Sequence, residues 1–267
     1  MMSIRTCTLI AAMSMAATMA LTACGPNRPG PIKHHFQDMY LARVPIEQKR
    51  TVLDAQQDWS LAKMALAEAR QEYEESVTAV KVAENEAKKA KLEANSIKEQ
   101  HKAAEKAGDL TQINDASLKL RSAKLLAKAA EQKVKYQRAH REYLRVNVDY
   151  KEDLMYQQEA TYEMSMARMA QNNNIQPRGF NMVDFEKQSD DRAMWVERTR
   201  ARLDKALALA KQAQDRETAL RAALGFEKDT LLFFYDLREM VSEADQEAVS
   251  NVIREEKKHL RRLAGLL

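Results

Sequence analysis

Helix-breaking residues are scarce in this chain, which has only six glycines and five prolines among 267 residues. They lie at 25–31, 45, 108, 177–179, 225 and 265, and this leaves uninterrupted blocks at 46–107, 109–176, 180–224 and 226–264. Gly and Pro are the residues that helix interiors tolerate least, so each block is free to form one long helix. The alternating pattern of β-strands is absent as well, and the sequence predicts an all-α protein.

Cysteine and aromatic residues are also few, and the charges are nearly balanced. The chain has two cysteines, Cys7 and Cys24, which excludes a disulfide framework. Aromatic residues make up 6% and charged residues 31% of the chain, a balance typical of long helices. A net charge of +4 spread over mixed signs indicates a solvated surface, so we expect no nucleic-acid partner.

The common motifs of enzyme active sites are missing. The chain contains no GxGxxG, P-loop, HExxH, GxSxG or CxxC sequence. His34, His35 and Asp38 are residue types that bind metals, but adjacent histidines point in different directions on a helix and no second cluster is near in sequence. We therefore expect a non-enzymatic protein with no catalytic residue, no cofactor and no metal.

What the sequence does contain is a heptad pattern over 52–104. Its a and d positions continue for about seven heptads, more than the three or four that indicate a coiled coil. One member of each a/d pair is nearly always Ala, which lets two helix backbones approach closely. We call this stripe the first seam; its members are Val52, Ala55, Trp59, Ala62, Leu66, Ala69, Tyr73, Ser76, Val80, Ala83, Ala87, Ala90, Ala94, Ile97, His101 and Ala104.

A matching stripe follows Gly108. Gly suits the left-handed residue that ends a helix, and Asp109 with Gln112 resembles a capping box. Folding the chain back at Gly108 pairs Ala90 with Ala127, and residues 45–172 are then a long antiparallel coiled-coil hairpin, about 90 Å long at 1.5 Å per residue. The second stripe is Ile113, Ala116, Leu120, Ala123, Ala127, Ala130, Val134, Gln137, Arg141, Leu144, Val148, Lys151, Met155, Gln158, Tyr162 and Ser165.

The fit between the two stripes is poorest at three pairs. Ser76 with Arg141, Leu66 with Lys151, and Trp59 with Gln158 do not match in polarity. We interpret these positions as snorkelling side chains or as places where a third helix packs.

A second aromatic face lies off this seam. Tyr136, Tyr143 and Tyr150 recur every seven residues, with Ala139 and Val146 between them. Packing by C-terminal helices is the favoured interpretation, because apolar area left in water is costly. The alternative is that the three tyrosines form a face for a partner.

Residues 173–182 form the clearest loop, and 183–267 are expected to be a helical pair. The stripe Val196, Leu203, Ala210 and Leu220 predicts one helix, and Gly225 with Phe226 resembles a helix stop. A break there gives a second, shorter C-terminal helical hairpin. The alternative is one helix continuing through Gly225, since a single Gly costs only about 1 kcal/mol.

The N-terminus carries an export signal. A short basic start precedes an apolar run over 6–20, which is too short to span a bilayer but suits a signal peptide. The next residues, Leu21-Thr22-Ala23-Cys24, closely resemble the lipobox of bacterial lipoproteins. The resemblance implies a signal peptide over 1–23 and a diacylglycerol on Cys24. Gly25, rather than Asp, then favours the outer membrane. Ordinary secretion and an uncleaved anchor are the alternatives.

Residues 24–44 are expected to be a Pro/Gly-rich tether between the lipid and the folded body. The resulting hypothesis is an outer-membrane lipoprotein facing the periplasm, which acts as a coiled-coil scaffold, spacer or adaptor. Its partner would be another envelope protein or the cell wall, and self-association stays open. The alternatives are a chaperone-like clasp with helical arms and an accessory subunit of an export or efflux assembly.

Overall fold

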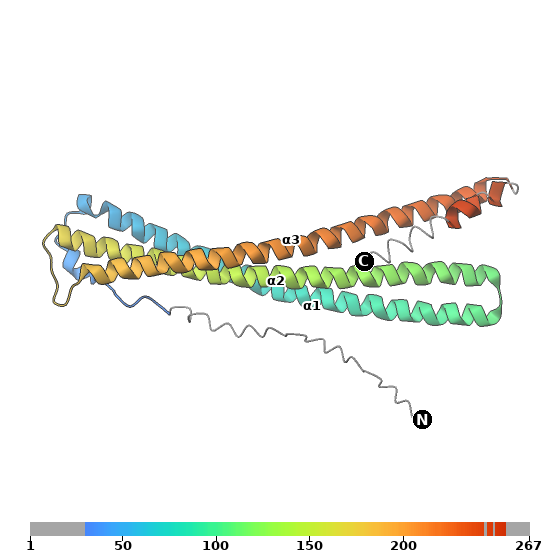
Figure 1. The fold of residues 1–267 in the computed structure, drawn as a ribbon, viewed down its shortest axis with the longest axis horizontal. Coiled ribbons are helices and arrows are strands. Elements are labelled where there is room, and N and C mark those ends of the chain that lie inside the picture. Colours follow the sequence, from blue (N-terminus) through green and yellow to red (C-terminus); the bar gives the residue numbers. More distant parts are fainter. Residues whose placement is uncertain (1–29, 243–244, 248, 255–267) are drawn as a thin grey trace, which may run out of the picture. The chain divides into compact units, whose positions relative to one another are not determined.

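The computed structural model describes residues 30–242, 245–247 and 249–254. Two short 3-10 helices, η1 (Asp38–Leu41) and η2 (Ile46–Lys49), precede the long helices α1 (Arg50–Ala107), α2 (Leu110–Asn172) and α3 (Met182–Met240) (Figure 1). No strand occurs in this described part, and the all-α prediction is confirmed. The chain divides into two units, Met1–Pro31 and Ile32–Leu267, and the helices all belong to the second, which we call the body.

The predicted hairpin turn lies at Gly108. This residue has φ 75°, the left-handed conformation that Gly adopts most easily, and its N–H donates to the carbonyl of Ala104 at 3.2 Å. Asp109 then accepts a hydrogen bond from the Gln112 N–H at 3.2 Å, as expected for a cap of the following helix. α1 and α2 run back along each other from this turn.

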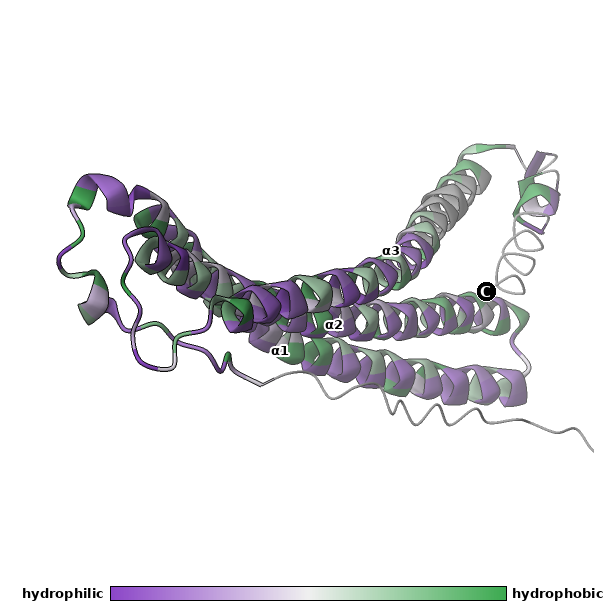
Figure 2. Ribbon diagram, turned by 60° about the vertical axis from the view of Figure 1, so that its left-hand side comes forward, coloured by the Kyte–Doolittle hydropathy of each residue, from purple (hydrophilic) through white to green (hydrophobic). Residues whose placement is uncertain are grey.

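Burial on α1 follows the first seam. All nine residues of α1 that are buried were predicted seam positions, which are Val52, Ala55, Ala62, Leu66, Ala69, Ser76, Val80, Ala83 and Ala94. On α2 the predicted partners Ala123, Val134, Leu144 and Tyr162 are buried. Figure 2 shows hydrophobic and hydrophilic residues interspersed along the helices, as expected where each helix buries only a narrow stripe.

Polar and aromatic contacts cross between α1 and α2. Ion pairs join Glu86 to Lys133 at 2.5 Å and Arg70 to Glu152 at 3.1 Å. The Trp59 ring stacks on Tyr162, one helical turn beyond its predicted partner Gln158, with ring centroids 5.6 Å apart. Two stacked rings bury more apolar area than a ring against an amide does, which favours the contact of Trp59 with Tyr162.

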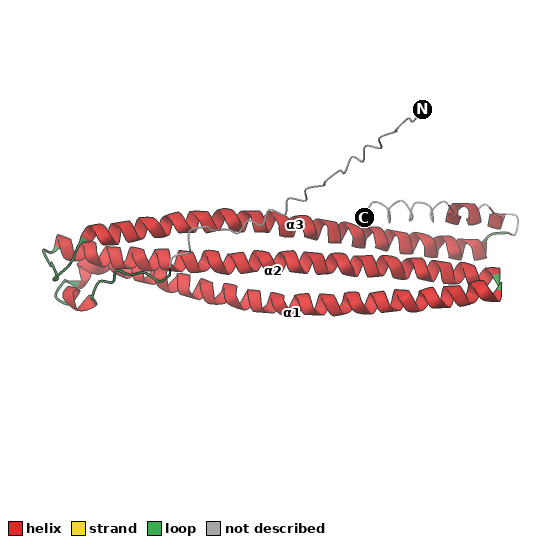
Figure 3. Cartoon of the chain, turned by 60° about the horizontal axis from the view of Figure 1, so that its bottom comes forward, coloured by secondary structure: helices red, strands yellow, loops and turns green. Residues whose placement is uncertain are grey.

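A third helix covers the other side of α2. α3 packs along α2 rather than on α1, so α2 is the central helix (Figure 3). Consequently no residue of 146–167 is fully exposed. Asn181 caps α3, with its side-chain oxygen accepting from the Val183 N–H at 3.2 Å, and Arg202 reaches Asp149 on α2 at 3.4 Å.

The predicted turn at Gly225 is wrong. α3 continues through Gly225 to Met240, so residues 183–267 are not a pair of helices separated at 225. Leu220, only 2% exposed, shows that α3 is still packed one turn before the glycine, and such packing offsets the roughly 1 kcal/mol that an interior Gly costs. Beyond Met240 the structure describes helical residues at 245–247 and 249–254, and the remainder of the predicted pair lies outside the described residues.

The predicted tether is shorter than 24–44. Ile32, Phe36, Leu41 and Val44 are each at most 7% exposed, so the body begins at Ile32. The side chains of Phe36, Leu41 and Val44 pack with the start of α1, the end of α2 and the start of α3, and we call this end of the body the base. Its core consists of Phe36, Leu41, Val44, Val52, Ala55, Tyr162, Met166, Ala167, Met169, Ala170 and Phe185.

Candidate functional site

The chain enters the body as an extended strap, residues 32–37, that lies against α2 and α3. The buried side chain of Gln188 on α3 holds its first half. The Gln188 Oε1 atom accepts from the N–H groups of Lys33 and His34 at 2.8 and 2.9 Å, and its Nε2 atom donates to the His34 carbonyl at 3.0 Å. One amide side chain therefore satisfies three backbone groups that would otherwise lack partners.

A buried carboxylate on α2 holds the second half of the strap. The Phe36 N–H donates to Glu163 Oε2 at 2.6 Å, and His35 Nδ1 lies 3.2 Å from Glu163 Oε1. Glu163 is 6% exposed, and burying a carboxylate is costly unless donors surround it. The strap supplies such donors, so the charge and the strap stabilise each other.

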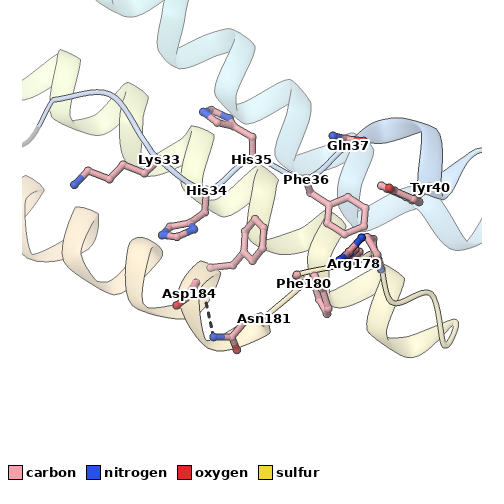
Figure 4. Close-up of a pocket in the computed structure, with 13 residues that line it drawn as sticks. Lys33, His34, His35, Phe36, Gln37, Tyr40, Arg178, Phe180, Asn181 and Asp184 are labelled. Atoms are coloured by element: carbon pink, nitrogen blue, oxygen red, sulfur yellow. Dashed lines mark hydrogen bonds between the residues drawn. The ribbon is translucent and has the colours of Figure 1, made fainter.

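Aromatic rings fix the strap to the base. Phe36 packs edge-on against Phe180 and Phe185 at centroid distances of 5.9 and 6.4 Å, and the His34 ring lies 6.1 Å from Phe185. Figure 4 shows Arg178 beside these rings, at a cavity of about 260 Å³. The cavity is open and is lined by strap, loop and α3 residues.

Further polar groups are buried between α2 and α3. Asp153 and Arg192 are 1% and 6% exposed, and the Arg192 guanidinium lies 5.1 Å from the Tyr156 ring centroid. Burial lowers the pKa of Arg192, and the negative charge of Asp153 offsets part of this lowering. Burial also raises the pKa of Glu159; the Glu163 charge adds to that rise, and His35 opposes it. These groups could not be singled out from the sequence, because they resemble ordinary charged residues on a helix.

The predicted partner face takes a different form. Tyr136 and Tyr143 sandwich His140, with ring centroids 5.8 and 5.9 Å apart. The three half-buried rings and the α1 residues Glu72 and Glu75 line an open groove of about 480 Å³. We call it the aromatic groove. α1, rather than a C-terminal helix, forms its opposite wall.

Other predicted residues lie apart from this groove. Tyr150 does not line it, although it is half-buried on the same helix, and Lys151 Nζ lies 5.9 Å from its ring centroid. His34, His35 and Asp38 do not converge, since His35 contacts Glu163 and Asp38 accepts from the Tyr162 hydroxyl at 3.5 Å. Cys24 lies outside the described residues.

Among the described helices, none combines the length and the hydrophobicity needed to cross a membrane. The chain matches no protein-family model, no curated protein and no solved structure. Its function therefore has to be argued from its own residues.

Proposed function

We propose that the chain is a non-enzymatic bacterial lipoprotein whose helical body is a scaffold, spacer or adaptor for another component of the cell envelope. The observation that carries this proposal is the sequence Leu21-Thr22-Ala23-Cys24 directly after a basic start and an apolar run. Several acyl chains on Cys24 would give an anchoring strength that a single chain does not reach. In this proposal the anchor lies in the outer membrane and the body faces the periplasm.

The dimensions of the body support a spacer. α1 has 58 residues and α2 has 63, so each is about 90 Å long at 1.5 Å per residue. The seam and α3 hold these helices side by side, which resists bending more than a single helix does. An elongated, supported body of this kind suits a protein that holds a partner away from its anchor.

The aromatic groove is the surface that we assign to the partner. Tyr136 and Tyr143 are half-buried, so their positions are fixed while part of each ring stays accessible. Tyr is enriched in the residues that dominate binding energy at interfaces. Glu72 and Glu75 on the opposite wall favour a partner segment that carries basic side chains.

Acylation and fractionation test the anchor. Metabolic labelling with a radioactive fatty acid should label the wild-type chain, which should sediment with outer membranes. Cys24→Ser should lose both properties. Recovery of the full-length, unlabelled wild-type chain in the cytoplasm would overturn the proposal.

Site-specific photo-crosslinking tests the adaptor role. A photo-reactive residue in place of Tyr143 should give one discrete adduct in intact cells, whereas the same residue in place of the exposed Leu92 on α1 should give none. Many heterogeneous adducts at position 143, together with suppression of client aggregation by the purified chain, would favour a chaperone instead.

A further inference from the structure

The strap limits how far the body can lie from its anchor. If Cys24 is lipidated, as proposed above and as this inference requires, only residues 25–31 separate the lipid from the docked strap. At about 3.5 Å per residue, Ile32 lies within about 28 Å of Cys24. A free tether as far as residue 44 would have allowed about 70 Å by the same geometry. The base, which contains the strap, is therefore the end of the body nearest to the lipid.

The base carries exposed apolar side chains within that reach. Met39 is 72% exposed, Ile46 61% and Tyr40 38%. They lie on either side of Leu41 and Val44 in the sequence, which are buried in the core of the base. The buried pair thus fixes the segment to the body while Met39 and Ile46 are held outward. Exposed apolar side chains are costly in water unless something covers them.

Basic side chains accompany these apolar ones. Arg43, Arg50 and Arg178 are all exposed at the base. Of the carboxylates nearby, Asp38 accepts from Tyr162 and Asp184 accepts from Asn181, and the exposed Glu47 is outnumbered by the three arginines. Apolar side chains beside exposed cations are typical of protein surfaces that lie on phospholipid headgroups.

We propose that the segment 38–50 rests on the phospholipid surface. Met39 and Ile46 enter the boundary between headgroups and acyl chains, and Arg43 and Arg50 contact phosphates. The occupant is a bilayer rather than a protein, because the short tether holds this segment beside the membrane. The contact orients the body with its base on the lipid and the Gly108 turn away from it.

Depth-dependent quenching tests this contact. In the lipidated chain the Cys24 thiol is blocked, so a cysteine introduced elsewhere is the one free thiol of the mature chain. Met39→Cys and Ile46→Cys, labelled with an environment-sensitive fluorophore and reconstituted in phosphatidylcholine/phosphatidylglycerol vesicles, should be quenched by lipids brominated near the headgroup. The control Leu126→Cys, 53% exposed and close to the Gly108 end of α2, should not be quenched. Arg43→Glu combined with Arg50→Glu should remove most of the quenching at position 39.

Mass spectrometry of the same sample separates the two proposals. A fully acylated chain with no quenching at positions 39 and 46 overturns the membrane contact and leaves the lipoprotein intact. Equal quenching at 39 and 126 also overturns it, because the body would then lie flat on the membrane. A chain without acyl groups on Cys24 overturns the proposed function itself.

Discussion

The backbone N–H of Phe36 donates to the Glu163 carboxylate at 2.6 Å, across 127 residues of sequence. This bond joins the first residues of the body to the central helix. Because Gln188 on α3 holds the same strap, the strap adds polar links between α2 and α3 to the contacts that these helices already make in the core of the base. The base therefore depends on two polar side chains as well as on its aromatic core.

We expect Glu163→Ala to loosen the strap. The substitution leaves the buried Phe36 N–H without its acceptor, which costs about 1–3 kcal/mol of the free energy of unfolding. Hydrogen exchange at residues 33–36 should accelerate at the same time. Glu186→Ala is the matched control, since Glu186 is exposed and its pair with Arg168 at 3.5 Å should contribute at most about 1 kcal/mol. Equal effects of the two substitutions in urea denaturation would contradict the role of the strap.

Glu159 should make stability depend on pH in a predictable direction. Burial raises the pKa of Glu159 in the folded chain, so the folded state binds the proton more tightly than the unfolded state does. The carboxyl group therefore destabilises the fold above its folded pKa, and this effect disappears as the pH falls toward the ordinary value of 4.5.

Glu159→Gln should accordingly raise the thermal midpoint at pH 7 and raise it less below pH 4.5. Thermal unfolding followed by circular dichroism across this range measures the difference. The exposed Glu68, changed to Gln, serves as the control and should show no such contrast. An equal rise at both pH values would show that packing, rather than the buried charge, is responsible.

The hairpin was predictable because its determinants are local and repeated. Every buried residue of α1 occupies a position that a seven-residue period selects, and Gly108 has the left-handed backbone that ends such a helix. A single side-chain contact that differs from the expected one, such as that of Trp59 with Tyr162, does not disturb a pattern of this length. The prediction needed no knowledge of which distant residues meet.

The strap and the polar groups beneath α3 could not be predicted in that way. Glu163, Gln188 and Asp153 look like surface residues until α3 and the strap cover them. Their burial follows from contacts between segments far apart in sequence, and no local spacing encodes such contacts. The prediction at Gly225 failed for a related reason, since helix propensity there was outweighed by packing along α2.

Cysteine pairs test the register of the seam. Ala90 and Ala127 are both half-buried, and their predicted pairing requires Cα atoms within the roughly 4.4–6.8 Å that a disulfide spans. Ala90→Cys with Ala127→Cys should crosslink quickly under mild oxidation, visible as a reducible change in gel mobility. Leu92→Cys with Leu126→Cys, at 69% and 53% exposure, should not crosslink. Failure of the first pair would mean that the two helices meet in another register.

Two glycines should respond to alanine with opposite signs. Gly108 has φ 75°, where a Cβ is strained, so Gly108→Ala should lower the free energy of unfolding by about 1–2 kcal/mol. Gly225 lies inside α3, and a Cβ there meets no atom within 4 Å, so Gly225→Ala should raise stability by about 0.5–1 kcal/mol. Urea unfolding of both variants measures the contrast, and no contact is altered in either case. Destabilisation by Gly225→Ala would mean that α3 breaks at this residue. Where a Cβ has room, alanine is unfavourable only if the backbone of the glycine is not helical.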